Sequence, residues 1–263
     1  MSAGMLAAQH AVVTGGGRGI GAAIARALAA EGARVTLIGR NNALLQATAA
    51  AITAELPGCA AGAVAADVSD GDAVRGAIDA ARANFGPIHI LINNAGQAGS
   101  APFIKTDEAL WNRMLAVNLT GTYLCTRAVL PDMLQASSGR IVNIASTAGL
   151  RGYTYVTAYT ASKHGVVGLT RALALEVAAN GITVNAICPG YTDTDIVGDA
   201  VKTIVNQTGR SAEQARALLA RTNPQHRLIQ PQEIAQAALW LCRADTGSIT
   251  GQCLSIAGGE VMV

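Results

Sequence analysis

The chain has 263 residues, of which 51% are hydrophobic and 14% are charged, and its formal net charge at pH 7 is +2. This length and apolar content suffice for one large α/β domain, or two small ones, with a full hydrophobic core. The 19 basic and 17 acidic residues form no basic block, so the electrostatic pattern of a nucleic-acid-binding protein is missing.

Membrane, secreted and metal-binding classes are also disfavoured. The longest stretch without Asp, Glu, Lys or Arg, residues 83–104, contains two prolines and the pair Asn93-Asn94, which do not suit a spanning helix. The residues before Gly15 do not resemble a secretory signal, and we expect a cytoplasmic protein. The five cysteines are scattered without a CxxC pair, which favours reduced thiols and predicts no metal site.

Seven short apolar segments alternate with helical patterns along the chain. Their hydrophobicity is continuous, which is typical of parallel strands buried on both faces. We therefore expect an α/β fold: a single doubly wound Rossmann-type domain over residues 1–263, with a seven-stranded parallel sheet and helices on both faces. The predicted strands are His10–Thr14, Arg34–Gly39, Ala61–Ala66, Ile88–Asn93, Arg140–Ala145, Ile182–Cys188 and Cys253–Ala257.

A glycine-rich loop joins the first predicted strand to the predicted helix Ala22–Glu31. Glycines there let the backbone turn tightly and approach a pyrophosphate, which the free N–H groups of the helix N-terminus attract. A plain glycine-rich turn is the alternative, but the strand before and the helix after favour dinucleotide binding. The candidate contacts are Gly15, Gly17, Arg18, Gly19, Ile20 and Gly21.

Two further candidate cofactor sites follow the third and fourth strands, because ligands of open α/β sheets bind at the carboxyl ends of the strands. The first is Asp67 with Val68, and the second is Asn94, Ala95 and Gly96. As alternatives, Asp67 could cap a helix beginning near Ser69, and the asparagines could form a turn.

The run from Ser146 to Lys163 carries the candidate chemistry. Tyr159 and Lys163 are four residues apart in a predicted helix, so both project from one face. A free tyrosine has a pKa of about 10, and a neighbouring ammonium favours its phenolate. Ser146 could hydrogen-bond a substrate oxygen while Tyr159 moves a proton on or off it. Taken alone, the Tyr and Lys pair also fits an ordinary amphipathic helix face.

In this order, the motifs resemble those of the classical short-chain dehydrogenase/reductase family over nearly the whole chain. The matching motifs are TGxxxGxG at Thr14–Gly21, NNAG at Asn93–Gly96, the helical Asn118, Ser146, YxxxK at Tyr159–Lys163, PGxxxT at Pro189–Thr194 and the tail Ile249–Gly259. The resemblance implies an NAD(P)(H)-dependent oxidoreductase that interconverts a secondary alcohol and a ketone. The competing hypothesis is a cofactor-binding regulator without chemistry.

The resemblance also implies residue roles. Ser146 would polarise the carbonyl, Tyr159 would be the acid/base, and Lys163 would bind the nicotinamide ribose and depress the tyrosine pKa. Asn118 would position a water behind Lys163, unless it caps a helix or is a buried amide satisfied by backbone. Thr194 would contact the nicotinamide carboxamide, together with Pro189, Gly190 and Thr192. The predicted substrate contacts are Ser146, Ala148, Tyr153, Tyr159 and Tyr191.

The end of the second strand bears on cofactor choice. NAD(H) enzymes place an acidic residue there, whereas this chain has Gly39 followed by Arg40. The planar guanidinium of Arg40, helped by Arg18, suits a 2′-phosphate. We predict NADP(H), with NAD(H) as the alternative if Arg40 merely faces solvent where a helix begins near Asn42.

Substrate identity is less constrained. We expect residues 195–230 to form a substrate lid with an apolar stripe, and its five cations could attract a CoA phosphate or merely form a solvated face. Ala148 stands where 3-hydroxybutyrate dehydrogenases have a carboxylate-binding histidine, which disfavours a small hydroxy acid. Leu175 stands where 3-oxoacyl-carrier-protein reductases have a cation, which disfavours carrier-protein docking. A neutral ketone or alcohol, or an acyl-CoA, remains.

The family resemblance also predicts a homotetramer, formed by pairing the long helices around Glu108–Leu134 and Ala158–Ala179. Small side chains such as Ala161, Gly165 and Gly168 would allow the helices to approach closely.

Overall fold

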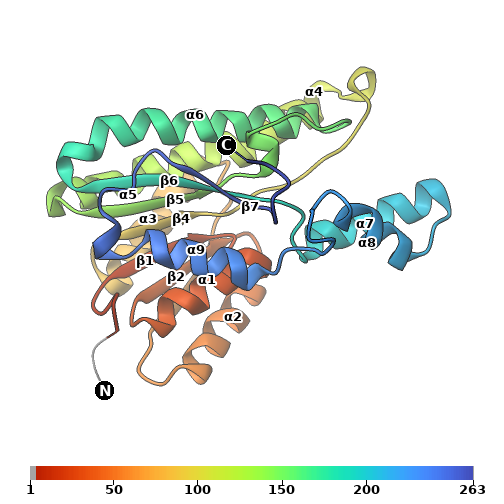
Figure 1. Cartoon of the computed structure of the whole chain (residues 1–263). Helices are drawn as coiled ribbons and strands as arrows, with labels where there is room; N and C mark the ends of the chain where they lie inside the picture. Colours follow the sequence, from red (N-terminus) through yellow and green to blue (C-terminus); the bar gives the residue numbers. More distant parts are fainter. Residues whose placement is uncertain (1–3, 263) are drawn as a thin grey trace.

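Seven parallel strands form one sheet in the computed structural model, which describes residues 4–262 (Figure 1). The strands are β1 (His10–Thr14), β2 (Arg34–Gly39), β3 (Ala61–Ala65), β4 (Ile90–Asn93), β5 (Gly139–Ile144), β6 (Ile182–Pro189) and β7 (Cys253–Ile256). Their order is β3-β2-β1-β4-β5-β6-β7, which confirms the predicted fold class. The order reverses between β1 and β4, and ligands of such sheets bind at this point.

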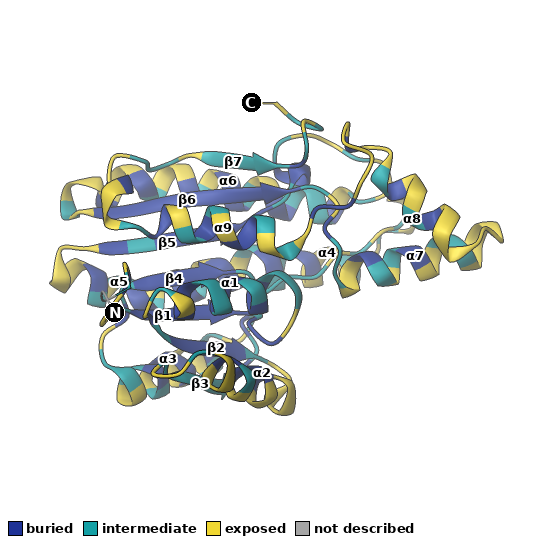
Figure 2. Cartoon of the chain, turned by 60° about the horizontal axis from the view of Figure 1, so that its bottom comes forward, coloured by how far each residue is buried: buried dark blue, intermediate teal, exposed yellow. Residues whose placement is uncertain are grey.

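Helices cover both faces of the sheet. They are α1 (Gly19–Ala30), α2 (Asn42–Glu55), α3 (Gly71–Phe85), α4 (Glu108–Leu115), α5 (Gly121–Ala136), α6 (Thr157–Val177), α7 (Asp195–Thr208), α8 (Ala212–Ala220) and α9 (Pro231–Leu241). The neighbouring strand residues Val12 and Val13 are both fully buried on opposite faces. Val13 packs in a core with α1, α2 and α9, and Val12 in a second core with α3, α5 and α6. Figure 2 shows the buried strands beneath helices whose outer surfaces are exposed.

Two predicted local features differ in the structure. The helix expected near Ser69 begins at Gly71 and is capped by Asp70, so the capping role considered for Asp67 was wrong. Asp67 instead accepts hydrogen bonds from the Ser69 N–H at 2.9 Å and hydroxyl at 2.7 Å. The single helix expected over Glu108–Leu134 is interrupted by a π-helical turn, η2 (Ala116–Thr120).

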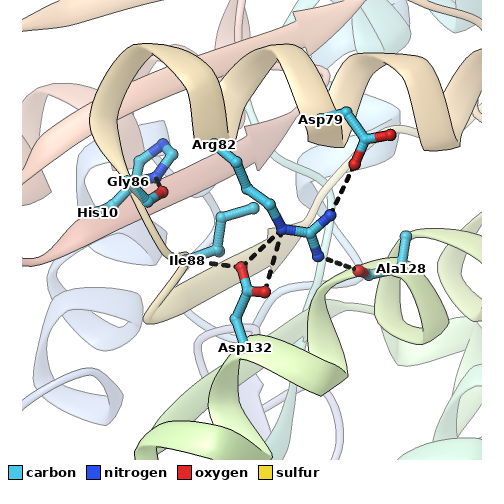
Figure 3. Close-up of polar contacts among 7 residues, drawn as sticks. All are labelled: His10, Asp79, Arg82, Gly86, Ile88, Ala128 and Asp132. Carbon is cyan, nitrogen blue, oxygen red and sulfur yellow. Dashed lines mark hydrogen bonds and ion pairs between the residues drawn. The ribbon is translucent and has the colours of Figure 1, made fainter.

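An ion-pair network ties α3 and α5 to the chain that enters β4 (Figure 3). The Arg82 guanidinium donates from Nε to both carboxylate oxygens of Asp132, at 3.0 and 2.9 Å, and also bonds the Ala128 carbonyl. Asp132 accepts a further bond from the Ile88 N–H at 2.9 Å. Its carboxylate therefore connects two helices to the loop before β4.

The predicted lid forms two helices, α7 and α8, that extend away from the sheet (Figure 1). Ser211 and Gln214 form the capping box that begins α8. Val197 and Val201 of α7 pack on Leu219 of α8 in a small separate core. Among the described helices, none is long and apolar enough to cross a membrane, and no described cluster of His, Cys, Asp and Glu could hold a metal ion.

Candidate active site

Four predicted catalytic residues come from three elements near the carboxyl edge of the sheet. Asn118 lies in η2, Ser146 lies two residues after the end of β5, and Tyr159 and Lys163 lie in α6. The Ser146 hydroxyl lies close enough to the Tyr159 phenol to lower its pKa. It also accepts the Ala148 N–H at 3.1 Å, because Ser146 caps the short 3-10 helix η3 (Thr147–Gly149). The cap therefore fixes the serine hydroxyl next to the tyrosine.

The Lys163 ammonium lies beneath this pair and is almost completely buried. Its Nζ donates to the Ile144 carbonyl at 2.8 Å and lies 5.7 Å from the centroid of the Tyr159 ring. A β-carbon added to Gly96 would lie 3.7 Å from Nζ, so the NNAG loop also borders the site. Burial lowers the pKa of Lys163 to about 8.

The environment of the Tyr159 phenol shifts its pKa upward. Burial raises the pKa of Tyr159, and the hydrogen bond from Ser146 opposes this shift only in part. The Lys163 ammonium donates to the Ile144 carbonyl, and its expected depression of the Tyr159 pKa stays a prediction. A neutral phenol suits proton donation to a carbonyl oxygen that gains negative charge.

Asn118 is a buried amide that is satisfied by backbone. Its Oδ1 accepts the Gln97 N–H at 2.9 Å, and its Nδ2 donates to the Gln97 carbonyl at 3.0 Å. The same Nδ2 lies 3.3 Å from Ser162 Oγ on α6. Of the roles considered from the sequence, the structure shows the buried amide satisfied by backbone. The positioning of a water by Asn118 stays a prediction.

The glycine loop fits a dinucleotide. Gly15 and Gly19 have φ angles of +64° and +53°, which side chains rarely allow. The first turn of α1 has no side-chain cap at Arg18 and no acidic residue, so its N–H groups remain available for a pyrophosphate. Asn94 fixes the loop by donating to the carbonyls of Thr14 at 3.0 Å and Gly15 at 3.2 Å.

The loop after β6 adjoins the glycine loop. The Thr192 hydroxyl donates to the Gly190 carbonyl at 3.0 Å, and the Thr194 hydroxyl donates to the Thr192 carbonyl at 3.2 Å. A β-carbon on Gly19 would lie 3.2 Å from the Thr194 methyl group. The other predicted cofactor contacts lie in the segments around these loops and stay predictions: Gly17, Ile20, Gly21, Val68, Ala95, Gly96 and Pro189.

The two predicted phosphate-binding arginines differ. The Arg18 guanidinium pairs with Asp195 of the lid at 2.8 Å. In this structure Arg18 therefore binds a carboxylate of the protein, and its predicted contact with a cofactor phosphate stays a prediction. Arg40 is exposed and makes no hydrogen bond or ion pair with any residue in 4–262. The pKa of Asp67 is lowered mainly by its hydrogen bonds from Ser69, and the Arg40 charge adds to this effect. Arg40 therefore lies near the predicted adenosine-binding region.

The predicted substrate residues lead to a cluster that sequence reasoning missed. Ala148 is 3% exposed, so it lies under the surface beside Ser146. The Tyr153 hydroxyl donates to Glu260 Oε1 at 2.6 Å and lies 2.9 Å from Thr147 Oγ1. Tyr191 is 37% exposed beside this cluster. The available signal for Glu260 was that it is the only acidic residue after Asp245.

Comparisons with known proteins agree with this geometry. A family model described as short chain dehydrogenase matches residues 9–204. The chain is 37% identical to a D-beta-hydroxybutyrate dehydrogenase of Cupriavidus necator over 98% of this chain and 99% of that protein. It is 36% identical to a 3-oxoacyl-acyl-carrier-protein reductase of Chlamydia trachomatis, over 97% and 98% of the two chains.

A crystal structure of an actinorhodin polyketide ketoreductase variant with NADPH matches with a TM-score of 0.93 and 36% identity, over 98% of this chain and 99% of that chain. The family match, these relatives and the Ser146, Tyr159 and Lys163 geometry lead to one conclusion. The chain belongs to the short-chain dehydrogenase/reductase family and is a nicotinamide-dependent oxidoreductase of secondary alcohols and ketones.

Proposed function

We propose that the protein works as a reductase that uses NADPH to convert a neutral ketone, or an acyl thioester bearing a ketone, into the secondary alcohol. The observation that carries the proposal is the placement of Ser146, Tyr159 and Lys163 together near the carboxyl edge of the sheet. Burial raises the pKa of Tyr159, which favours the protonated phenol that proton donation needs. Ser146 lies beside the same phenol, so both hydroxyls can reach one carbonyl oxygen.

The chain supplies binding and proton transfer. A bound nicotinamide cofactor would supply the hydride. The N-terminus of α1 and the glycine loop would hold its pyrophosphate. Ser146 would hydrogen-bond the substrate carbonyl oxygen, and Tyr159 would donate its proton to that oxygen as negative charge develops. The Lys163 ammonium would stabilise the phenolate that remains.

NADPH as the cofactor rests on Gly39 and Arg40 at the end of β2, where the chain has a cation and no acidic side chain. A structurally similar ketoreductase was crystallised with NADPH, which supports the same choice. NAD(H) is the alternative, and comparing kcat/KM for the two reduced cofactors tests it.

A neutral ketone is favoured over CoA thioesters because most lid cations are already paired. Lys202 pairs with Asp199 at 3.0 Å, and Arg216 pairs with Asp193 at 2.7 Å. Arg227 also pairs with a carboxylate, which leaves few unpaired lid charges for CoA phosphates. Relatives named as hydroxybutyrate dehydrogenase and carrier-protein reductase mark two other substrate classes. Ala148, in place of a carboxylate-binding histidine, disfavours a small hydroxy acid. Leu175, which is 85% exposed and stands in place of a cation, disfavours a carrier protein.

The test is to mix the purified protein with NADPH and a panel of neutral ketones and to follow absorbance at 340 nm. Turnover that disappears in Tyr159→Phe supports the proposal, since only the proton donor is removed. Cofactor binding without turnover across the panel would instead favour the regulator, the competing class.

We further propose a cytoplasmic homotetramer that forms through α4, α5 and α6. Large apolar side chains on these helices are exposed in the single chain: Trp111 at 37%, Tyr123 at 44%, Leu134 at 41% and Leu175 at 85%. Such a surface favours association. Light scattering should report four subunits, Leu175→Glu should weaken the assembly, and a monomeric wild type would contradict the proposal.

A further inference from the structure

A buried carboxylate lies near the catalytic serine and comes from the C-terminal tail. The side chain of Glu260 is only 3% exposed. Gly258 and Gly259, which follow β7, have φ angles of +61° and +93°. These left-handed conformations turn the chain back, because residues with a β-carbon rarely adopt them. The tail thereby brings Glu260 under Tyr153.

One oxygen of this carboxylate is occupied. Glu260 Oε1 accepts the Tyr153 hydroxyl at 2.6 Å and lies 3.7 Å from the Arg151 guanidinium. Since the phenol has one proton and gives it to the carboxylate, the Thr147 hydroxyl at 2.9 Å donates to the phenol oxygen. Thr147 directly follows Ser146, so Glu260 is connected to the catalytic serine through two side chains.

The other oxygen, Oε2, has no hydrogen-bond partner among residues 4–262. It lies 3.2 Å from the place where a β-carbon of Gly190 would be. The next residue is Tyr191, whose pKa is raised by burial and by the Glu260 charge. Oε2 is thus a free acceptor beside Gly190 and Tyr191, in the loop that follows β6.

The charge of Glu260 is incompletely balanced. Its nearest cation, Arg151, is 46% exposed at the side chain and 3.7 Å away, so solvent screens much of that attraction. A second anion brought into the site would be repelled by the buried carboxylate, while a hydroxyl, amide or ammonium group would satisfy Oε2. The carboxylate therefore acts on what can bind next to Ser146.

We propose that Glu260 determines substrate specificity: its carboxylate excludes ketones that carry a carboxylate near the carbonyl and accepts a hydrogen bond from neutral or cationic substrates with an N–H or O–H donor. This inference rests on the proposed ketone reductase function. It excludes keto acids as substrates and attributes this exclusion to Glu260 in the C-terminal tail.

The experiment compares two substrates of nearly equal shape, acetoacetamide and acetoacetate, in the wild type and in Glu260→Gln. The amide-to-acid ratio of kcat/KM should fall at least tenfold in the variant, because glutamine keeps the shape and removes the charge. Intrinsic reactivity of the two ketones cancels when the ratios are compared. An unchanged ratio would overturn the inference while leaving the reductase function intact.

Two control variants separate charge from structure. Tyr153→Phe loses the hydroxyl that contacts Glu260 but keeps the carboxylate, so it should retain most of the wild-type preference for the amide. Glu55→Gln removes a carboxylate from an exposed pair with Arg26 and should leave the ratio unchanged. If Tyr153→Phe reproduced the loss of preference seen in Glu260→Gln, Glu260 would be only a support for Tyr153, and the inference would fail.

A second measurement uses only the wild-type protein, so it does not depend on whether a variant folds. Butyramide and butyrate are tested as competitive inhibitors of the reduction of a neutral ketone by the wild type, and butyrate should bind at least tenfold more weakly. Equal or tighter binding of butyrate would overturn the proposal. If no ketone is reduced at all, the proposed function fails, which is a different result.

Discussion

The most informative perturbation for cofactor choice is Arg40→Ala. Arg40 follows Gly39 at the end of β2, is exposed, and has no polar partner among residues 4–262. Removing it therefore breaks no described contact and leaves no buried group unpaired. Any change in cofactor affinity would therefore come from the proposed contact between Arg40 and the cofactor.

The size of the effect follows from the type of contact. A hydrogen bond between a guanidinium and a phosphate contributes about 1.5–3 kcal/mol. At about 1.4 kcal/mol per tenfold change, this corresponds to a rise of roughly 10- to 150-fold in the dissociation constant of NADPH. NADH has no 2′-phosphate, so its affinity should change by less than about threefold on the same scale. Fluorescence titration of both reduced cofactors measures these constants directly.

Arg26→Ala is the matched control, because Arg26 is also a surface arginine but pairs with Glu55 at 3.0 Å on the outer helices. It should leave both cofactor affinities unchanged. Equal losses for NADPH and NADH in Arg40→Ala would show that the 2′-phosphate is not the contact. A wild type that favours NADH in kcat/KM would refute the interpretation of Gly39 and Arg40 altogether.

Four further outcomes are expected. Tyr159→Phe should lower kcat by about 10²–10⁴-fold with cofactor affinity retained, and activity close to that of the wild type would contradict its role as the acid. Because the pKa of Lys163 is about 8, its ammonium loses its proton above that pH, so kcat/KM should decline there; a flat profile to high pH would contradict this. Asp132→Ala should destabilise the fold by about 2–4 kcal/mol in urea denaturation, because it leaves the Arg82 Nε–H and the Ile88 N–H without their acceptor, whereas Asp79→Ala, at an exposed carboxylate on the same guanidinium, should cost less than about 1 kcal/mol. Burial lowers the pKa of His10 below 6.5, so the unfolded state binds more protons and stability should fall as the pH drops below about 6.5; His10→Gln should reduce this dependence, and equal urea midpoints at pH 7.5 and 5.5 would contradict it.

The predictable part of the site lies where local patterns and parallel topology decide the outcome. The carboxyl ends of parallel strands share one edge, so the loops after β1 and β4 had to approach each other once the strands were identified. Asn94 indeed bonds the carbonyls of Thr14 and Gly15. Tyr159 and Lys163 face one side because helical spacing places them there.

The unpredicted part depends on contacts between distant segments. Arg18 and Asp195 are 177 residues apart, and Tyr153 and Glu260 are 107 apart, so no local pattern pairs them. The path of the tail depends on the positive φ angles at Gly258 and Gly259, and their glycine identity alone does not fix that direction. The π-helical turn at Asn118 also has no signal in the local sequence.

That π-helical turn explains how one amide joins three parts of the site. Asn118 bonds both backbone groups of Gln97, as a neighbouring strand would, and so continues the ordered chain beyond the end of β4. Its bond to Ser162 joins the same point to α6, directly before Lys163. π-turns are often found at functional sites, where the extra residue redirects side chains from a regular helix. The amide therefore positions the NNAG loop against α6, and the lysine and tyrosine gain their geometry from a contact that touches neither of them.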